Sequence, residues 1–205
     1  RDRIGGTWDL FRYPGIRCDS DMNTFGYAFR PWPQDAVITD GESIRTYVRE
    51  TAEAYGVDER ITFGQRVTRA SWSTDEGRWT ITHVDEATGQ EHTTTARFAV
   101  SCTGYYDYDR GHQPDFPGVD AYGGTLVHPQ FWPEDLDHAG KRVLVIGSGA
   151  TAVTLVPAMA PDAEHVTMLQ RSPAYVVSIP ETDPVSPHLR KVLPDRVVDD
   201  LARYR

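Results

Sequence analysis

Hydrophobic positions recur at helical spacing in one early segment of the chain. After Asp40-Gly41-Glu42-Ser43 they form a stripe that ends at Gly56, made of Ile44, Tyr47, Val48, Thr51, Ala52 and Tyr55. Apolar residues every three to four positions, with an acidic start and a glycine end, are typical of an amphipathic helix. The pattern therefore predicts a helix over residues 40–55.

Three short strands are predicted after this helix. Runs rich in β-branched and aromatic residues cover 67–72, 78–84 and 93–102, and the segments 73–77 and 86–89 between them have turn composition. Short runs separated by such turns indicate antiparallel hairpins. We expect a three-stranded meander whose last run, one or two strands long, ends at Thr103-Gly104.

A second α/β segment begins at Lys141. Residues 142–146 are apolar and β-branched, as expected of a buried parallel strand, a helix follows from about residue 150, and 165–170 is the returning strand. Residues 1–40 and 105–140 are rich in Gly, Pro and aromatic residues, so we expect both to be irregular. The last residues, 201–205, have the pattern of the middle of a helix.

Composition narrows the function classes. The 205 residues carry a net charge of −9, which argues against a nucleic-acid surface. No run approaches the roughly 20 apolar residues of a membrane span, so membrane association is not indicated. Cys18 and Cys102 are expected to be free thiols in a reducing cytoplasm, and neither they nor the histidines have metal-ligand spacing, so no metal is expected.

The segment Gly147-Ser148-Gly149-Ala150-Thr151-Ala152 has the form GxGxxA and follows directly on the predicted strand 142–146. The first glycine permits a tight turn, and the second lets the backbone approach a pyrophosphate. The small sixth residue lets strand and helix pack closely, while the helix N-terminus supplies N–H donors. With Val153 in the first helical turn, this segment predicts a dinucleotide site rather than a turn without a ligand.

The tip of the returning strand indicates which dinucleotide is bound. NAD sites usually place an acidic residue there, about 20 residues after the glycines, to bind the ribose hydroxyls. This chain has Arg171 and Ser172 instead. A guanidinium can pair bidentately with a 2′-phosphate, so NADPH is preferred over NADH. The alternative is an ordinary exposed arginine after a strand.

Two longer motifs point to a family. Gly5-Gly6-Thr7-Trp8, followed by Tyr13-Pro14-Gly15 and Asp19, fits the pattern [A/G]GxWxxxx[F/Y]P[G/M]xxxD. Adjacent glycines allow close approach to a flat ligand, and Trp8 offers an aromatic wall. The second motif, [F/Y]xGxxxHxxxW[P/D], is matched by Tyr122, Gly124, His128, Trp132 and Pro133.

On these motifs the chain resembles the type I Baeyer–Villiger monooxygenases, and within them the mycobacterial-type FAD-containing monooxygenases that activate thioamide prodrugs such as ethionamide. The resemblance implies an α/β fold of two dinucleotide-binding domains, three-layered and Rossmann-like, with a β-meander insert. It implies a partial FAD-binding domain over 1–120, an interdomain linker over 121–140 and the start of an NADPH-binding domain over 141–205. The fold is expected to be incomplete in this chain, with the first FAD glycine loop missing.

The resemblance also implies roles for individual residues. The flavin side would be formed by Gly5, Gly6, Thr7, Trp8, Asp19, Phe25, Val67, Thr103 and Gly104, with Arg17, Cys18 and Asp19 also facing the nicotinamide. The NADPH side would be formed by Gly147, Ser148, Gly149, Ala150, Thr151, Ala152, Val153, Arg171 and Ser172. Gly124, His128 and Trp132 would couple domain motion to catalysis without performing chemistry.

The implied reaction uses FAD, NADPH and O2. A peroxyflavin would insert oxygen into a ketone, or would oxygenate a sulfide or thioamide at sulfur. Asp19 is the implied catalytic residue, but a carboxylate beside an anionic peroxyflavin needs a cation between them. The family's arginine for that task has no counterpart in this sequence, and the family's first FAD glycine loop is missing as well. We therefore expect the isolated chain to bind FAD poorly and to turn over little.

Two alternatives remain open from the sequence. One is an N- or S-oxygenating flavin-containing monooxygenase. The other is a non-catalytic NADPH-binding module without flavin. The physiological substrate and the oligomeric state are not indicated by any motif.

Overall fold

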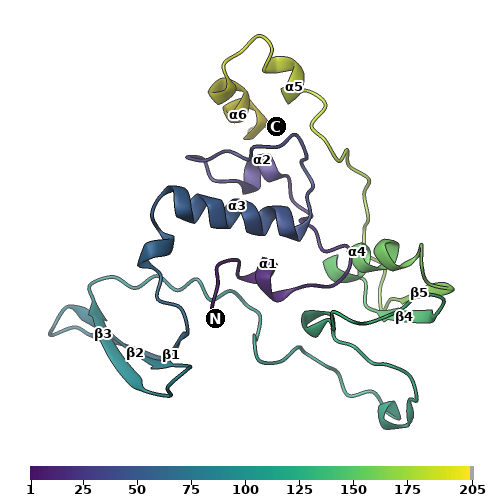
Figure 1. Cartoon of the computed structure of the whole chain (residues 1–205), viewed down its shortest axis with the longest axis horizontal. Helices are drawn as coiled ribbons and strands as arrows, with labels where there is room; N and C mark the ends of the chain where they lie inside the picture. The colour runs from purple at the N-terminus through teal and green to yellow at the C-terminus, as the bar shows by residue number, and fades with distance from the viewer. Residues whose placement is uncertain (204–205) are drawn as a thin grey trace. The chain divides into compact units, whose positions relative to one another are not determined.

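The computed structural model describes residues 1–203 and contains both helices and strands (Figure 1). The α-helices are α1 (Thr7–Leu10), α2 (Met22–Phe25), α3 (Gly41–Ala54), α4 (Ala150–Met159), α5 (Ser186–Leu189) and α6 (Asp195–Arg203). The strands are β1 (Gln65–Ser73), β2 (Arg78–Asp85), β3 (Glu91–Ala96), β4 (Arg142–Ile146) and β5 (His165–Leu169), and 3-10 turns occupy η1 (Asp58–Arg60), η2 (Val119–Ala121) and η3 (Pro129–Phe131).

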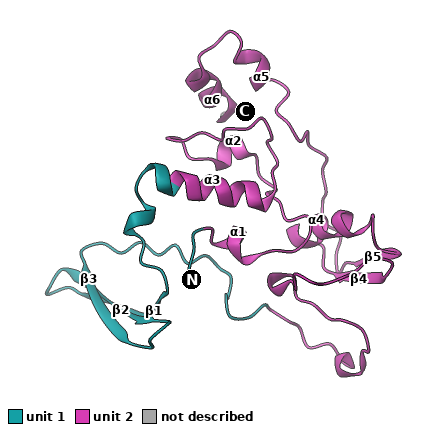
Figure 2. Ribbon diagram, viewed as in Figure 1, with its two compact units in different colours: residues 1–4, 52–111 teal, residues 5–51, 112–205 magenta. Residues whose placement is uncertain are grey.

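The residues fall into two compact units (Figure 2). Unit 1 comprises residues 1–4 and 52–111, and unit 2 comprises residues 5–51 and 112–205. This division by contacts differs from the three cofactor-domain ranges expected from the sequence. Those ranges remain our proposal for how the chain is organised around cofactors.

Unit 1 contains the antiparallel sheet β1-β2-β3, which confirms the meander. Trp72 on β1 lies opposite Trp79 on β2, with ring centroids 5.6 Å apart. His83 on β2 lies opposite His92 on β3. Such cross-strand pairs stabilise a hairpin and fix its register.

The third predicted strand is shorter in the structure than the sequence indicated. β3 ends at Ala96, and residues 97–102 form no strand. Phe98 and Val100 are 87% and 86% exposed. Because apolar composition makes a strand only when a neighbouring strand accepts its hydrogen bonds, the prediction of strand beyond Ala96 is wrong for this chain.

Helix α3 confirms the first predicted element and organises the core of unit 2. Ile44 is fully buried and Tyr47 is 5% exposed, and both pack with Cys18, Met22 and Trp32. The Asp40 carboxylate accepts hydrogen bonds from the N–H of Ser43 at 2.9 Å and from its hydroxyl at 2.7 Å. Burial raises the pKa of Asp40, but these hydrogen bonds outweigh it and lower the pKa below its ordinary value.

The segment β4–α4–β5 also forms as the sequence predicted. β4 and β5 pair in parallel from Arg142↔His165 to Ile146↔Leu169, and α4 contacts both strands. The expectation that β4 is buried is wrong, since Leu144 and Ile146 are 57% and 52% exposed. Alternate side chains of a strand point to opposite faces, and here only one face is covered.

The last segment of unit 2 returns to its first segment. The N–H of Val37 donates to the carbonyl of Glu181 at 2.9 Å, and the N–H of Asp183 donates to the carbonyl of Asp35 at 3.0 Å. Beyond them α6 contacts α2 (Figure 1). The predicted terminal helix is present up to Arg203, and its last two positions, 204 and 205, lie outside the described residues. Among residues 1–203, no helix is long and apolar enough to cross a membrane.

Candidate cofactor-binding site

Unit 2 contains a cavity of about 330 Å³ that is formed by α1, the end of α2 and α3. Its lining residues are Gly5, Thr7, Trp8, Phe25, Tyr27, Tyr47 and Val48. Four of these residues are aromatic, and flat rings around a small cavity suit a planar ligand rather than a flexible chain. Gly5, Thr7, Trp8 and Phe25 were singled out from the sequence, whereas Tyr27, Tyr47 and Val48 were not.

The glycine pair shapes the entrance to α1. Gly5 and Gly6 have φ of +140° and +54°, which L side chains rarely adopt. The N–H of Trp8 donates to the carbonyl of Gly5 at 3.0 Å, so the chain turns directly into the helix. A Cβ on Gly5 would lie 2.8 Å from the Cβ of Asp9, so packing inside the protein already requires glycine at position 5.

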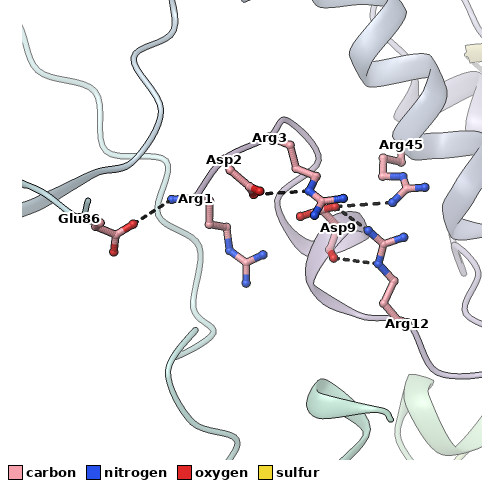
Figure 3. A network of polar contacts seen from close by, with 7 residues as sticks. All are labelled: Arg1, Asp2, Arg3, Asp9, Arg12, Arg45 and Glu86. Carbon is pink, nitrogen blue, oxygen red and sulfur yellow. Dashed lines mark hydrogen bonds and ion pairs between the residues drawn. The ribbon is translucent and has the colours of Figure 1, made fainter. Parts of the chain in front are cut away.

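The carboxylate of Asp9, on α1, forms ion pairs with two arginine side chains (Figure 3). Its side chain is 5% exposed, and its Oδ1 lies 2.6 Å from Nη2 of Arg12 and 3.6 Å from Nη1 of Arg45. Arg45, on α3, also pairs with Glu42, which lowers the pKa of Glu42 and raises that of Arg45. A buried carboxylate is tolerated because two guanidiniums hold it, and the contact ties the Gly5–Trp8 segment to α3.

Tyr47 holds the opposite wall of the cavity. Its ring stacks on that of Tyr27 with centroids 5.8 Å apart, and its hydroxyl accepts the N–H of Tyr27 at 2.9 Å and donates to the carbonyl of Arg30. Burial raises the pKa of the Tyr47 phenol, which keeps the hydroxyl protonated and able to donate. The helical stripe had marked Tyr47 as a core residue; its hydroxyl contacts depend on a loop 20 residues away.

The predicted residues Arg17, Cys18 and Asp19 differ in exposure. Arg17 and Asp19 are exposed, and Asp19 accepts a long hydrogen bond from the hydroxyl of Ser20 at 3.4 Å. Within residues 1–203 no cation pairs with Asp19. Cys18 is 3% exposed in the core, and burial raises the pKa of its thiol. The assignment of Cys18 to the nicotinamide side remains a proposal, in which its backbone rather than its buried thiol would face the cofactor.

Three other predicted flavin-side residues belong to unit 1. Val67, on β1, is 60% exposed, and Thr103 and Gly104 are exposed in the segment after the meander. Gly104 has φ of +69°, a left-handed conformation that glycine permits. Their assignment to the flavin remains a proposal.

The predicted nucleotide loop connects β4 to α4. Gly147 has φ of +129°, its N–H donates to the carbonyl of Leu169 at 2.9 Å, and Gly149 is the N-cap of α4. Nothing lies within 4 Å of a Cβ built on Gly147 or Gly149, so the protein leaves open space at both glycines. Ala150, Thr151, Ala152 and Val153 form the first turn of α4, and Ala152 is buried at 5% exposure. The loop thus places the start of a helix beside open space, as a phosphate site requires.

The tip of β5 lies against this loop. The hydroxyl of Ser148, in the glycine loop, is 3.5 Å from the carbonyl of Ser172. The residues that follow β5 therefore lie beside the glycine loop. Arg171 and Ser172 are exposed, and within residues 1–203 the Arg171 guanidinium makes no hydrogen bond or ion pair with another protein group. A free guanidinium at this place can bind a phosphate.

The second sequence motif forms a turn within unit 2. The Nδ1 atom of His128 accepts the N–H of Gln130 at 3.2 Å and so caps η3. Gly124 lies under Tyr122, since a Cβ there would be 2.5 Å from the Tyr122 hydroxyl. Trp132 is half-buried at the end of η3. These contacts explain the motif as local structure, and its coupling role remains a proposal.

Comparison with known proteins gives consistent matches. A family model described as flavin-binding monooxygenase-like matches residues 19–188. The chain is 59% identical over 209 residues to MymA of Mycobacterium tuberculosis, covering 100% of this chain and 42% of MymA. It is 52% identical over 206 residues to the FAD-containing monooxygenase EthA of Mycolicibacterium smegmatis, again covering 100% of this chain and 42% of the relative. The chain thus spans less than half the length of these relatives.

A solved structure agrees with the sequence matches. The cyclohexanone monooxygenase from Rhodococcus sp. Phi1 bound to NADP+ superimposes with a TM-score of 0.76 at 27% identity. The match covers 97% of this chain and 36% of that enzyme. The order of helices and strands described above is therefore the order found in part of that α/β enzyme.

Proposed function

The chain belongs to the flavin-binding monooxygenase-like family, and from that premise we propose that it serves an FAD- and NADPH-dependent monooxygenase. Such an enzyme transfers one oxygen atom of O2 to a small organic substrate. The observation that carries the proposal is that unit 2 holds both an aromatic cavity behind a glycine pair and a strand–glycine loop–helix segment. A plain NADPH-binding module would need only the second feature.

The cavity fits the proposed flavin. Trp8, Phe25 and Tyr27 provide ring faces, and a hollow of about 330 Å³ accepts part of a tricyclic ring rather than a whole dinucleotide. Thr7 and the backbone of Gly5 and Gly6 would contact the ligand's polar edge. The Asp9 ion pairs keep Trp8 in place, so the wall exists before the ligand binds.

The glycine loop fits the proposed NADPH. Gly147 would provide the tight turn, and Ser148 and Gly149 would place backbone N–H groups against the pyrophosphate at the start of α4. Arg171 would pair with the 2′-phosphate, and the Ser148–Ser172 contact would keep the two parts of the site together. The orientation of the nicotinamide is the task that we assign to Arg17 and Asp19.

FAD, when bound, supplies the redox chemistry by accepting hydride from NADPH and activating O2. The protein's residues bind, orient and exclude water. Asp19 is exposed beside the core cluster, and a carboxylate there would attract and orient a cationic group near the flavin. Such a cation between them would offset the repulsion between the Asp19 carboxylate and an anionic flavin. Asp19 remains our candidate for the catalytic residue.

For the substrate, we propose a ketone that undergoes Baeyer–Villiger oxygen insertion, with sulfides and thioamides oxygenated at sulfur as alternatives. Support for the ketone comes from a matched cyclohexanone monooxygenase crystallised with cyclohexanone. We also propose a cytoplasmic location, because both cysteines are free thiols.

The test uses the protein expressed from its complete gene. We expect flavin absorbance bands after purification, NADPH oxidation that depends on a ketone, and an ester or lactone as product. Cyclohexanone and methyl phenyl sulfide would be compared at equal concentration. Sulfoxide without any ester would favour the S-oxygenating alternative, and NADPH binding without flavin bands would reduce the protein to a nucleotide-binding module.

A further inference from the structure

Both backbone polar groups of Tyr27 are held by side chains from distant helices. Its N–H donates to the hydroxyl of Tyr47 on α3 at 2.9 Å. Its carbonyl accepts Nη2 of Arg203 on α6 at 2.9 Å and, within the same loop, the N–H of Arg30 at 3.2 Å. The same Nη2 lies 3.4 Å from the carbonyl of Gly26. Tyr27 lines the aromatic cavity, so one wall of the cavity is fixed from two sides.

The Arg203 contact joins parts of the sequence that are far apart. Arg203 lies 176 positions after Tyr27 and follows the strand β5 and the proposed NADPH residue Arg171. Fixing a loop through such a distant side chain is possible only in the folded protein. The last described helix is thus connected to the wall of the proposed flavin cavity.

Helix α6 packs against the rest of unit 2, so the backbone that carries the Arg203 side chain has a defined position. Val198 is fully buried and Ala202 is 3% exposed, and α6 contacts α2, which carries Phe25 of the cavity. Arg190 also reaches Asp199 at 2.7 Å, which ties α6 to α5. A rigid helix that carries one long donor can hold a loop in one conformation.

We propose that Arg203 is a positioning residue of the cavity: it sets the backbone of Tyr27 and thereby the ring that faces the ligand. Since the ligand is taken to be the flavin, the functional meaning of this proposal rests on the proposed function. Arg203 does not itself line the cavity.

A purely structural role of Arg203 predicts a different result from a positioning role. If the side chain served only to stabilise α6, its loss would lower stability and leave Tyr27 unchanged in the folded protein. If it positions Tyr27, the environment of that ring changes while the fold persists. Arg196 provides the matched control, because it is an exposed arginine on the same helix.

The experiment labels the full chain with 3-fluorotyrosine and follows Tyr27 by 19F NMR, with its resonance assigned through Tyr27→Phe. We expect Arg203→Met to shift or broaden the Tyr27 resonance and Arg196→Met to leave it in place. Identical Tyr27 resonances in the two variants overturn the proposal. If Arg203→Met lost its helical circular dichroism, Arg203→Gln against Arg196→Gln would decide by the same criterion.

A second measurement makes the same substitutions in the protein expressed from its complete gene, removes bound FAD, and follows quenching of flavin fluorescence as FAD is added back. We expect Arg203→Met to bind FAD roughly fivefold more weakly than wild type, the order of one lost hydrogen bond, and Arg196→Met to bind like wild type. Equal affinity of all three proteins counts against the positioning role. Absence of FAD binding by wild type contradicts the flavin assignment, whereas the 19F result still decides whether Arg203 positions Tyr27.

Discussion

Gly15 lies directly against the main chain of Thr154: a Cβ built on Gly15 would come 2.6 Å from the carbonyl oxygen of Thr154 and 2.6 Å from the Cβ of Ala158. The bend of the first sequence motif therefore packs on α4, the helix that follows the glycine loop. Within unit 2, this contact brings the segment beside the aromatic cavity onto the nucleotide helix.

The first prediction concerns this contact. Gly15→Ala should destabilise unit 2, because φ at position 15 is +77° and the new methyl group has no room. Gly118→Ala is the matched control, since Gly118 has φ of +84° and nothing within 4 Å. We expect about 1 kcal/mol for the control from backbone strain. Gly15→Ala should cost a further 1–3 kcal/mol, roughly, from overpacking.

Urea unfolding followed by tryptophan fluorescence measures both variants. Trp8 and Trp32 pack in unit 2 and report on its core. Equal losses for Gly15→Ala and Gly118→Ala would show that the contact with α4 contributes nothing beyond the backbone term.

The second prediction concerns the hydroxyl of Tyr47. Tyr47→Phe keeps the ring but leaves the N–H of Tyr27 and the carbonyl of Arg30 without this partner. We expect a loss of about 1–3 kcal/mol in the free energy of unfolding. Tyr175→Phe, at a fully exposed tyrosine, should change stability by less than roughly 0.5 kcal/mol. Similar unfolding curves for the two variants would rule out a clamping role of the Tyr47 hydroxyl.

The third prediction is a pH dependence that arises from Asp40. Hydrogen bonds from Ser43 lower the pKa of Asp40 below its ordinary value of 3.8. A carboxyl with a lowered pKa stabilises the fold above the unfolded-state pKa, and this contribution disappears as pH falls through the folded-state pKa. The Asp40 contribution should therefore be complete at neutral pH and be lost in the acid range below the ordinary value.

Two substitutions test this cap of α3. Asp40→Ala should cost about 1 kcal/mol at pH 7, the usual value of an N-cap, and its difference from wild type should shrink in acid. Asp40→Asn should keep most of the capping and lose the pH dependence. Thermal unfolding by circular dichroism between neutral and acid pH measures both, and a constant difference between Asp40→Ala and wild type at every pH would contradict the assignment.

The fourth prediction concerns cofactor preference. Arg171→Ala should weaken NADPH binding by roughly 10- to 100-fold, because a charge-assisted phosphate contact is lost, and should change NADH binding little. Titration calorimetry with each nucleotide measures this ratio, with Arg196→Ala as the exposed-arginine control. An equal effect of Arg171→Ala on NADPH and NADH would remove the 2′-phosphate from the role of Arg171.

Much of the local structure could be predicted because it depends on neighbouring residues. The spacing of Ile44, Tyr47 and Val48 gave α3, and the GxGxxA segment gave the turn from β4 into α4. Where a partner elsewhere in the chain was needed, the same reasoning failed. Phe98 and Val100 have strand composition but no pairing strand, and Leu144 has a buried-strand pattern but only one covered face.

The sequence by itself determined the residues of the proposed nucleotide loop, since the glycines, the helix start and the guanidinium of Arg171 are properties of the residues and their order. Only the tertiary structure decided the cavity. Tyr27 lines it, and its N–H and carbonyl contact Tyr47 and Arg203, which lie 20 and 176 residues away along the chain. Residue pattern and spacing predict contacts between neighbours along the chain. A hydrogen bond between distant segments exists only after packing has brought them together.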